Sequence, residues 1–473
     1  MRQAISEIDS RDNACTTALG AWQAVWIQTR RPDAACRGPV KVFRVLAAEG
    51  AAPAFLHSGE GAGGRFSMIA LDEESRLRID QTEPGDPFQR LQAAIDGAPR
   101  HTGPRPDIPF IGGWLGFFSY DLLHHVERIA TRAAADHTFP LIELGFFRTV
   151  LCYDHASQRW TACRLIRGGQ SSEAATNELS RLLDRLATAP LPPQKPSPPL
   201  RCRLCSNFTR QQYEAAVART LEYIAAGDIY QVNIAQRFEG RLQAPPHLLA
   251  QRLFDASPAP FSAFLPLGDR AIVSSSPERF LMVRDRTVET WPIKGTRPRG
   301  ATPEQDARLL RELLASEKET AELTMITDLL RNDIGRVCSY GSVNVASHRA
   351  VASFRNVHHT YSRVMGRLRR DTTVSDLIRA TFPGGSVTGA PKVRAMEIIE
   401  EIEPTSRGPY CGAIGYIGVD GSIDLSIVIR TILCEGDRIT FQVGGGIVAD
   451  SLPALEYDET LHKARGMMRA LDQ

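Results

Sequence analysis

The chain has 473 residues, enough for two or three domains and for a large buried core. Its 56 Lys and Arg residues nearly balance its 54 Asp and Glu residues, which argues against nucleic acid or a membrane surface as partner and favours a small-molecule substrate. The first thirty residues lack the apolar core of a signal peptide, and no uncharged apolar run is long enough to span a bilayer, so we expect a cytoplasmic protein.

Three parts follow one another along the chain. Residues 1–186 are rich in strand-forming residues and punctuated by glycines, as in the stretch 110–117. Residues 187–200 contain six prolines without periodicity, which predicts a linker or a long surface loop. Residues 201–473 carry the motifs with chemical content.

In the third part, helices and strands alternate at irregular spacing, which favours an α+β fold over a doubly wound sheet. Thr209 and Gln212 have the spacing of a capping box, and similar signals mark later helix starts. Helices are predicted from about 210 to 227, from 302, from 316 to about 331, over 391–403, and after 450–451. Strands are predicted at 230–238 and 271–276, as a hairpin at 279–283 and 287–291, and as two or three antiparallel strands across 410–443.

The nine cysteines are scattered and show no spacing typical of a disulfide framework. Cys202 and Cys205 have the C-x-x-C spacing of zinc and redox sites, but no second ligand pair follows at zinc-finger spacing. We therefore expect reduced thiols, and we attribute this pair to chance spacing in a loop.

Lys294 follows the apolar end of a predicted strand and precedes Gly295, where the backbone can approach a ligand and a long amine can reach into a cleft. Sixteen residues earlier, Glu278 stands at a proline-marked junction between two predicted strands. A carboxylic acid and an amine on adjacent strands can serve as general acid and nucleophile. Two simpler interpretations stay open: a solvated surface lysine, and a turn carboxylate paired with an arginine.

Two predicted helices each carry a pair of glutamates three residues apart, Glu319 with Glu322 and Glu456 with Glu459, so each pair projects from one helix face. Four converging carboxylates would suit Mg²⁺, which prefers oxygen ligands; ordinary surface glutamates are the alternative. Lys463 adds a cation to the carboxylate face of the last helix, for which a salt-bridge ladder is the alternative.

The glycine runs 384–385 and 444–446 offer exposed backbone N–H groups. The second run shortly precedes a predicted helix start, where an anion is favoured. Neither run has the spacing of a nucleotide-binding loop.

Together these segments resemble the chorismate-utilising enzymes, a family that includes anthranilate, isochorismate, salicylate and aminodeoxychorismate synthases. The resemblance covers about residues 207–470 and extends more weakly through 57–59, 65–66 and 112–120. It implies an α+β fold in which two antiparallel sheets form a large two-layer β-sandwich flanked by helices, with 187–200 as a surface loop of one unit. The motifs that carry it are 228–233, 276–279, 328–335, 389–396 and 444–451.

Within this family, Lys294 is the discriminating position. Anthranilate synthases typically carry alanine there, in a Pro-Ile-x-Gly-Thr motif, whereas aminodeoxychorismate synthases carry lysine, and the loop 383–389 is also similar to that of the latter. The resemblance thus implies conversion of chorismate and ammonia to 4-amino-4-deoxychorismate, for p-aminobenzoate and folate biosynthesis. Anthranilate or isochorismate synthesis is the alternative within the family. A non-catalytic regulatory subunit that binds chorismate or tryptophan is the alternative of another class.

The same resemblance implies roles for individual residues. Glu278 would be the general acid at the C4 hydroxyl of chorismate, and Lys294 the covalent nucleophile at C2. Mg²⁺ would be bound by the glutamates Glu322 and Glu459, with Glu319 and Glu456 in supporting roles. Leu323 departs from the family pattern, in which a polar residue often follows the metal-binding glutamate. The substrate-binding positions would be His359, Thr388, Arg430, Gly445, Gly446 and Lys463.

The resemblance also implies partners. Ammonia would come from a separate glutamine amidotransferase subunit, so the active unit would be a heterodimer. Some aminodeoxychorismate synthases bind tryptophan as a structural ligand, and ordinary core packing is the alternative for the corresponding residues, which are Ser58, Arg65, Phe66, Pro260 and Phe261. The first thirty or so residues match nothing in the family.

Overall fold

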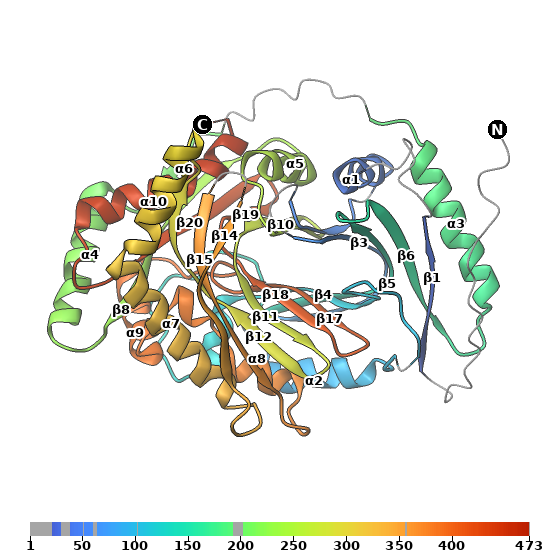
Figure 1. Cartoon of the computed structure of the whole chain (residues 1–473), viewed down its shortest axis with the longest axis horizontal. Coiled ribbons are helices and arrows are strands. Elements are labelled where there is room, and N and C mark those ends of the chain that lie inside the picture. Colours follow the sequence, from blue (N-terminus) through green and yellow to red (C-terminus); the bar gives the residue numbers. More distant parts are fainter. Residues whose placement is uncertain are drawn as a thin grey trace.

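The structure is a computed structural model, and the residues that it describes are 21–29, 38–50, 52–59, 64–101, 103–192, 202–354 and 357–472. Most of the predicted linker, residues 193–200, lies outside the described residues. So do residues 1–20 of the N-terminal segment that matches nothing in the family. Two antiparallel sheets dominate the described chain, and helices surround them (Figure 1).

The first sheet contains strands from both halves of the chain. Every ladder in it is antiparallel, and β2 and β3 of the N-terminal half join β9 of the C-terminal half. Its strands, in spatial order, are β1 (Trp22–Gln28), β6 (Arg159–Arg167), β5 (Ile142–Asp154), β3 (Phe66–Ile79), β2 (Ala54–His57), β9 (Phe261–Leu267), β10 (Arg270–Ser276), β19 (Thr431–Glu435), β20 (Arg438–Ile447) and β8 (Gln231–Arg241), with the two-residue strands β7 (Cys205–Ser206) and β16 (Gly389–Ala390) paired to β8.

The second sheet branches from β5, whose first half pairs with β4 instead of β6. β12 and β13 pair with successive parts of one edge of β15, and β14 pairs with the opposite edge. From β5 the strands follow as β4 (Gly113–Phe118), β17 (Ala413–Gly418), β18 (Ile423–Ile427), β11 (Arg279–Arg284), β12 (Thr287–Trp291), β15 (Val357–Arg367), β13 (Ile293–Pro298) and β14 (Asn344–Ser353).

Helices cover the outer faces of the sheets (Figure 1). α3 contacts β1 and β6, α5 contacts β10, and α4, α9 and α10 contact β8 or β20. On the other side, α7 contacts β13 and β15. The helices are α1 (Pro39–Ala48), α2 (Pro87–Gly97), α3 (Ser172–Thr188), α4 (Arg210–Ala225), α5 (Pro246–Ala256), α6 (Pro303–Ala315), α7 (Glu317–Gly335), α8 (Val374–Thr381), α9 (Lys392–Ile402) and α10 (Pro453–Ala470), with the 3₁₀ turns η1 (Tyr120–His125) and η2 (Gly385–Val387).

The largest apolar core combines side chains of both sheets, such as Ile272 of β10 and Leu425 of β18. A second core lies between the first sheet and α1, α3, α5 and α10, and a third between β8 and the helices α4 and α9. Burial of this much apolar surface is the main driving force for such a fold. The α+β prediction and the two-layer antiparallel architecture are confirmed.

Most predicted elements of the third part are confirmed. Thr209 and Gln212 form the expected capping box on α4, and β11 pairs with β12 as a hairpin. The prediction for 410–443 was wrong, because the region contains four strands, β17 to β20. β18 and β19 are separated at Val428–Arg430, where Arg430 interrupts the apolar residues but no glycine or proline marks the break.

Two predictions from composition can be compared with the described residues. Their cysteines are all free, with Cys202 buried and Cys205 exposed. No helix among them combines the length and apolar character needed to cross a bilayer.

Candidate active site

Two chain segments cross side by side from one sheet to the other. The first leads from β10 to β11 through Pro277 and Glu278, and the second leads from β18 to β19 through Arg430. The backbone N–H of Ile427 donates to the Glu278 carbonyl at 3.0 Å, and that of Ser275 donates to the Arg430 carbonyl at 3.1 Å. This pairing places Glu278 and Arg430 together between the sheets.

Glu278 is a buried acid, 7% exposed. Burial raises its pKa to about 7, against the opposing effects of a hydrogen bond from Ser386, the charge of Lys294 and the Ile293 N–H group. The interpretation as a turn carboxylate paired with an arginine was wrong, because the adjacent Arg279 binds Asp424 at 3.0 Å. A carboxyl group with this pKa can donate a proton near neutral pH.

Lys294 lies in β13, opposite Thr360 of β15. The ladder shifts register directly after it, at Gly295, whose φ of +81° is strained for any other residue. The Lys294 side chain is only 14% exposed, so the solvated-lysine interpretation was wrong, and its Nζ lies 3.8 Å from a carboxylate oxygen of Glu322. Burial lowers the pKa of Lys294; Glu322 opposes this effect and Lys463 adds to it.

Four of the predicted site residues act on Lys294 electrostatically: Glu322 of α7, Lys463 and Glu459 of α10, and Glu278. The structure therefore brings the predicted acid, the predicted nucleophile and both carboxylate-bearing helices to one place. Only the hairpin of β11 and β12 separates Glu278 from β13, whereas α7 and α10 come much later in the sequence.

The carboxylate pairs border the glycines of the site. A Cβ atom on Gly295 would lie 3.0 Å from Glu319 Oε2, and one on Gly445 would lie 3.2 Å from Glu456 Oε2 and 3.7 Å from Glu459 Oε1. A side chain at either glycine would therefore crowd the carboxylates, which is a physical reason for glycine at both positions.

Cations and a hydroxyl hold these carboxylates. Arg297 donates to Glu319 at 2.8 Å, and Ser451 donates to Glu456 at 2.6 Å. Lys463 binds Glu459 at 2.6 Å, as the salt-bridge alternative proposes, and it also donates to the Gly444 carbonyl at 2.8 Å. In the described chain, no three His, Cys, Asp or Glu side chains converge as they would around a bound metal ion.

The donor chemistry nevertheless fits Mg²⁺. All four glutamates supply oxygen, and Glu319 Oε2 is buried without a hydrogen-bond partner among the described residues. Burial and the nearby Glu459 raise the pKa of Glu456, an effect that a divalent cation would reverse.

His359 is buried beside Gly295. Its Nδ1 lies 2.8 Å from the Thr296 hydroxyl and 3.3 Å from the Gly295 carbonyl. Burial, assisted by the charge of Arg430, lowers its pKa to about 4. Arg430 is itself desolvated, which lowers its pKa, and it has a positive φ of +52°. A desolvated arginine beside a neutral imidazole is suited to a substrate carboxylate.

Thr388 and Gly446 lie against β8. The Thr388 hydroxyl donates to the Gly384 carbonyl at 3.1 Å, and Gly446 pairs with Asn233. Gly446 thus directly follows Gly445, which borders the glutamates of α10, and Thr388 lies on the loop that carries Ser386.

The five residues predicted for tryptophan lie at one end of three neighbouring strands. Ser58 directly follows β2, Arg65 and Phe66 are at the start of β3, and Pro260 and Phe261 are at the start of β9. Arg65 lies over the Phe66 ring at 4.5 Å and binds Asp154 at 3.0 Å. The sequence-distant positions thus meet, although residues 60–63 beside them are outside the described chain.

Two polar residues escaped the sequence-based assignment. Ser386 binds Glu278, and Gln231 is fully buried, with neither amide atom hydrogen-bonded among the described residues. A Cβ atom on Gly446 would lie only 2.4 Å from Gln231 Nε2, too close for any side chain at that position. Gln231 lies in the motif 228–233 and Ser386 in the loop 383–389. Their place in these family motifs is the sequence feature that could have identified them.

Comparisons with known proteins agree on the family. Residues 52–469 match the family model described as chorismate binding enzyme. Aminodeoxychorismate synthase component 1 from Escherichia coli is 41% identical over 86% of this chain and 87% of its own length. Anthranilate synthase component 1 from Thermus thermophilus is 38% identical over 92% of this chain and 95% of its own length.

Solved structures agree on the fold. Anthranilate synthase component I from Streptococcus pneumoniae is 32% identical and covers 86% of this chain and 93% of its own, with a TM-score of 0.76. The menaquinone-specific isochorismate synthase from Escherichia coli, 18% identical, covers 96% of this chain and 95% of its own with a TM-score of 0.69, which shows the shared fold. The chain belongs to the family of chorismate binding enzymes.

Proposed function

We propose that this protein is the large component of an aminodeoxychorismate synthase, which converts chorismate and ammonia to 4-amino-4-deoxychorismate. The observation that carries the proposal is the pairing of Glu278, whose pKa is about 7, with the buried Lys294, whose pKa is lowered. A protonated acid and a neutral amine are the forms that the reaction requires.

The reaction consists of two allylic displacements. Glu278 gives its proton to the C4 hydroxyl, which leaves as water, while the neutral amine of Lys294 forms a bond to C2 and the ring double bonds shift. Ammonia then attacks C4, the double bonds shift back, and the bond between C2 and Lys294 breaks. The nitrogen now bound to C4 gives up one proton, which restores the proton of Glu278, and Lys294 leaves C2 as the free amine.

Glu322 and Glu459 would hold Mg²⁺, supported by Glu319 and Glu456. The ion, when bound, draws electron density toward the ring carboxylate of chorismate. The protein's own part is to orient these carboxylates: Arg297 and Ser451 hold the two supporting glutamates, and Lys294 and Lys463 contact the other two.

Substrate carboxylates would be bound by Arg430 and Lys463, together with backbone N–H groups near Gly445 and Gly446, while His359 and Thr388 shape the pocket beside them. Arg430 is suited to this task because it is partly buried and pairs with no carboxylate among the described residues.

Ammonia would come from a glutamine amidotransferase subunit in a heterodimer. The component 1 designation of the relatives supports this partner. Tryptophan would bind beside Ser58, Arg65, Phe66, Pro260 and Phe261, a proposal that rests on the meeting of these residues at one end of β2, β3 and β9.

Anthranilate synthesis is the second candidate, since relatives with that designation are nearly as similar as those named aminodeoxychorismate synthase. Lys294 is the residue that favours the first candidate. The test is incubation of the purified chain with chorismate, MgCl₂ and an ammonium salt, followed by separation of the products. We expect 4-amino-4-deoxychorismate; anthranilate without it would overturn the proposal.

A further inference from the structure

Arg407 and Glu403 form an ion pair in the interior, 3% and 6% exposed. Glu403 directly follows α9, and Arg407 lies four residues further along the chain, outside any helix. The guanidinium is bidentate: Nε donates to Glu403 Oε2 at 2.9 Å and Nη2 donates to Oε1 at 2.7 Å. The rings of Tyr120 and Tyr410 pack on the guanidinium at 4.8 and 5.7 Å.

The remaining donors of Arg407 bind backbone carbonyls from two other segments. Nη1 donates to the Val387 carbonyl at 2.9 Å, and Nη2 donates to the Asn233 carbonyl at 2.8 Å. Glu403 also accepts the backbone N–H of Ala235 at 2.9 Å. The pair therefore joins β8 to the loop 384–388, in addition to joining its own two residues.

Asn233 completes this junction. Its Nδ2 lies 3.0 Å from the Ser386 carbonyl and 3.3 Å from the Thr388 carbonyl, and its backbone N–H donates to the Thr388 carbonyl at 2.8 Å. Three consecutive carbonyls of the loop, those of Ser386, Val387 and Thr388, are thus held by Arg407 and Asn233. The side chain that this loop presents to Glu278 is Ser386.

We propose that the Arg407–Glu403 pair is a positioning device for the acid: it fixes the loop 384–388 against β8 and next to the segment of Glu278, so that Ser386 stays beside the Glu278 carboxyl group. Arg407 and Glu403 touch neither Glu278 nor Lys294 in any contact of the described structure and act through the loop. The inference rests on the role of Glu278 as general acid in the proposed function.

The groups that face these residues limit the alternatives. Lys294 of β13, Ser386 and the Ile293 N–H face Glu278, and Cys411 feels its charge from the segment before β17. Arg407 is faced by Glu403, Tyr120, Tyr410 and Cys411. Among these contacts, the loop 384–388 is the segment that connects Arg407 to the surroundings of Glu278, through Ser386.

The test compares the pH dependence of kcat/KM for chorismate in the wild type and in Arg407→Lys and Ser386→Ala, with ammonium salt as nitrogen source. Lysine keeps the charge but cannot span Glu403 and both carbonyls from one nitrogen. Loss of the Ser386 hydrogen bond raises the pKa of Glu278, so we expect the limb near pH 7 to move upward by roughly one pH unit in both variants. We also expect kcat to fall roughly tenfold or more in Arg407→Lys, within what a positioned acid contributes.

The matched control is Arg270→Lys, which weakens another buried arginine–glutamate pair, with Glu143, in the first sheet. It should leave the limb near pH 7 in place. A folded Arg407→Lys enzyme with the wild-type pH profile and kcat would overturn the inference. If that variant does not fold, Glu403→Gln replaces it, with the same expected shift and the same contradicting result. Product identity in the wild type tests the proposed function separately, because the pH comparison holds for either amination product.

Discussion

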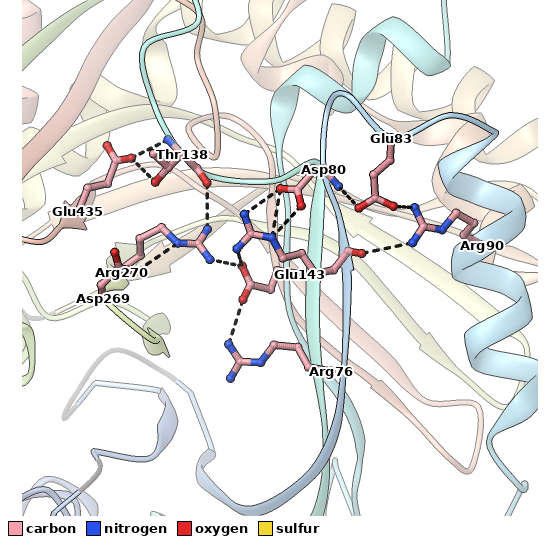
Figure 2. Close-up of polar contacts among 10 residues, drawn as sticks. Arg76, Asp80, Glu83, Arg90, Thr138, Glu143, Asp269, Arg270 and Glu435 are labelled. Atoms are coloured by element: carbon pink, nitrogen blue, oxygen red, sulfur yellow. Dashed lines mark hydrogen bonds and ion pairs between the residues drawn. The ribbon is translucent and has the colours of Figure 1, made fainter.

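Two buried arginine–glutamate pairs stabilise different regions of this molecule, and they differ in what their spare donors bind. In the first sheet, Arg270 of β10 binds Glu143 of β5 through one nitrogen at 2.9 Å (Figure 2). Near the candidate site, Arg407 binds Glu403 through two nitrogens. Both glutamates are almost inaccessible to solvent, so burial alone does not distinguish the two pairs.

The Glu143 pair is the centre of a side-chain network. Arg76 of β3 also donates to Glu143 at 2.9 Å (Figure 2). Arg78 approaches Glu143 to 4.0 Å. The network continues outward to exposed partners such as Asp80. Three strands of the first sheet are joined in this way, which is a contribution to the fold.

The Arg407 pair is instead connected to backbone groups near the candidate site. Its spare donors bind carbonyls of Asn233 and Val387, next to the residue that binds the acid Glu278. The comparison teaches that the same chemical pair serves the scaffold in one place and the reactive site in another, according to the groups on which its remaining hydrogen bonds end.

The largest effect is expected at the acid itself. Glu278→Gln removes the proton donor while keeping the shape of the side chain, so kcat should fall by about 10²–10⁴-fold. Steady-state rates with chorismate and ammonium salt measure this, and thermal unfolding of the same variant should be close to that of the wild type. A loss smaller than that of Arg407→Lys would contradict the idea that Arg407 acts through Glu278.

The scaffold pair should show the opposite pattern. Glu143→Ala leaves Arg270 buried without its carboxylate, which costs about 3–5 kcal/mol when a buried pair is broken. We expect a lower midpoint of denaturant unfolding, with kcat/KM per folded molecule and its pH profile preserved. A shifted limb near pH 7 would remove the distinction between the two pairs.

The carboxylates of α10 should affect the metal requirement. Glu459→Gln removes a proposed ligand charge, so the Mg²⁺ concentration for half-maximal rate should rise, by roughly ten- to a hundredfold if the loss resembles that of a supporting ligand. Titration of activity with MgCl₂ provides the measurement. An unchanged metal dependence would exclude Glu459 from the site.

The pH profile should report the coupled pair of Glu278 and Lys294. Activity requires Glu278 protonated and Lys294 neutral, so kcat/KM should pass through a maximum and fall on both sides. The pKa of Glu278 is about 7 and that of Lys294 is below its ordinary value, so one limb should titrate near pH 7. Glu278→Gln should abolish that limb, and its persistence would assign the limb to another group.

The smallest effect is expected on the surface. Arg308 and Glu312 form an exposed pair on α6 at 2.9 Å. Exposed pairs of this spacing contribute about 0.3–0.5 kcal/mol, so Arg308→Ala should change neither the unfolding midpoint measurably nor the pH profile. A loss comparable to that of Glu143→Ala would show that burial is a poor guide to the worth of these pairs.

The sequence was informative where neighbouring residues alone indicate the chemical role of a side chain. Glu278 beside a proline, Lys294 before a glycine and the glutamates at helical spacing became candidates from their own neighbours. Their roles came from the family resemblance, and the structure brings the residues together. The N-terminal caps of α4, α6 and α7 were also predictable, because a capping hydroxyl binds a backbone N–H group only three residues away.

The sequence was uninformative where tertiary packing decides. Arg430 lies at a crossing between sheets that no glycine or proline marks, which is why β18 and β19 were not separated. Glu403 and Arg407 have the spacing of an ordinary surface ladder, and only the packing of Tyr120 and Tyr410 makes the pair internal. The contact between Ser386 and Glu278 joins segments more than a hundred residues apart.

The most direct test of the central claim is mass analysis of the enzyme after incubation with chorismate and MgCl₂ in the absence of ammonia. We predict a chorismate-derived adduct on the peptide that contains Lys294, and its absence in Lys294→Ala. An adduct that persists in Lys294→Ala, or a wild-type enzyme that turns over with ammonia yet never carries an adduct at Lys294, would contradict the account.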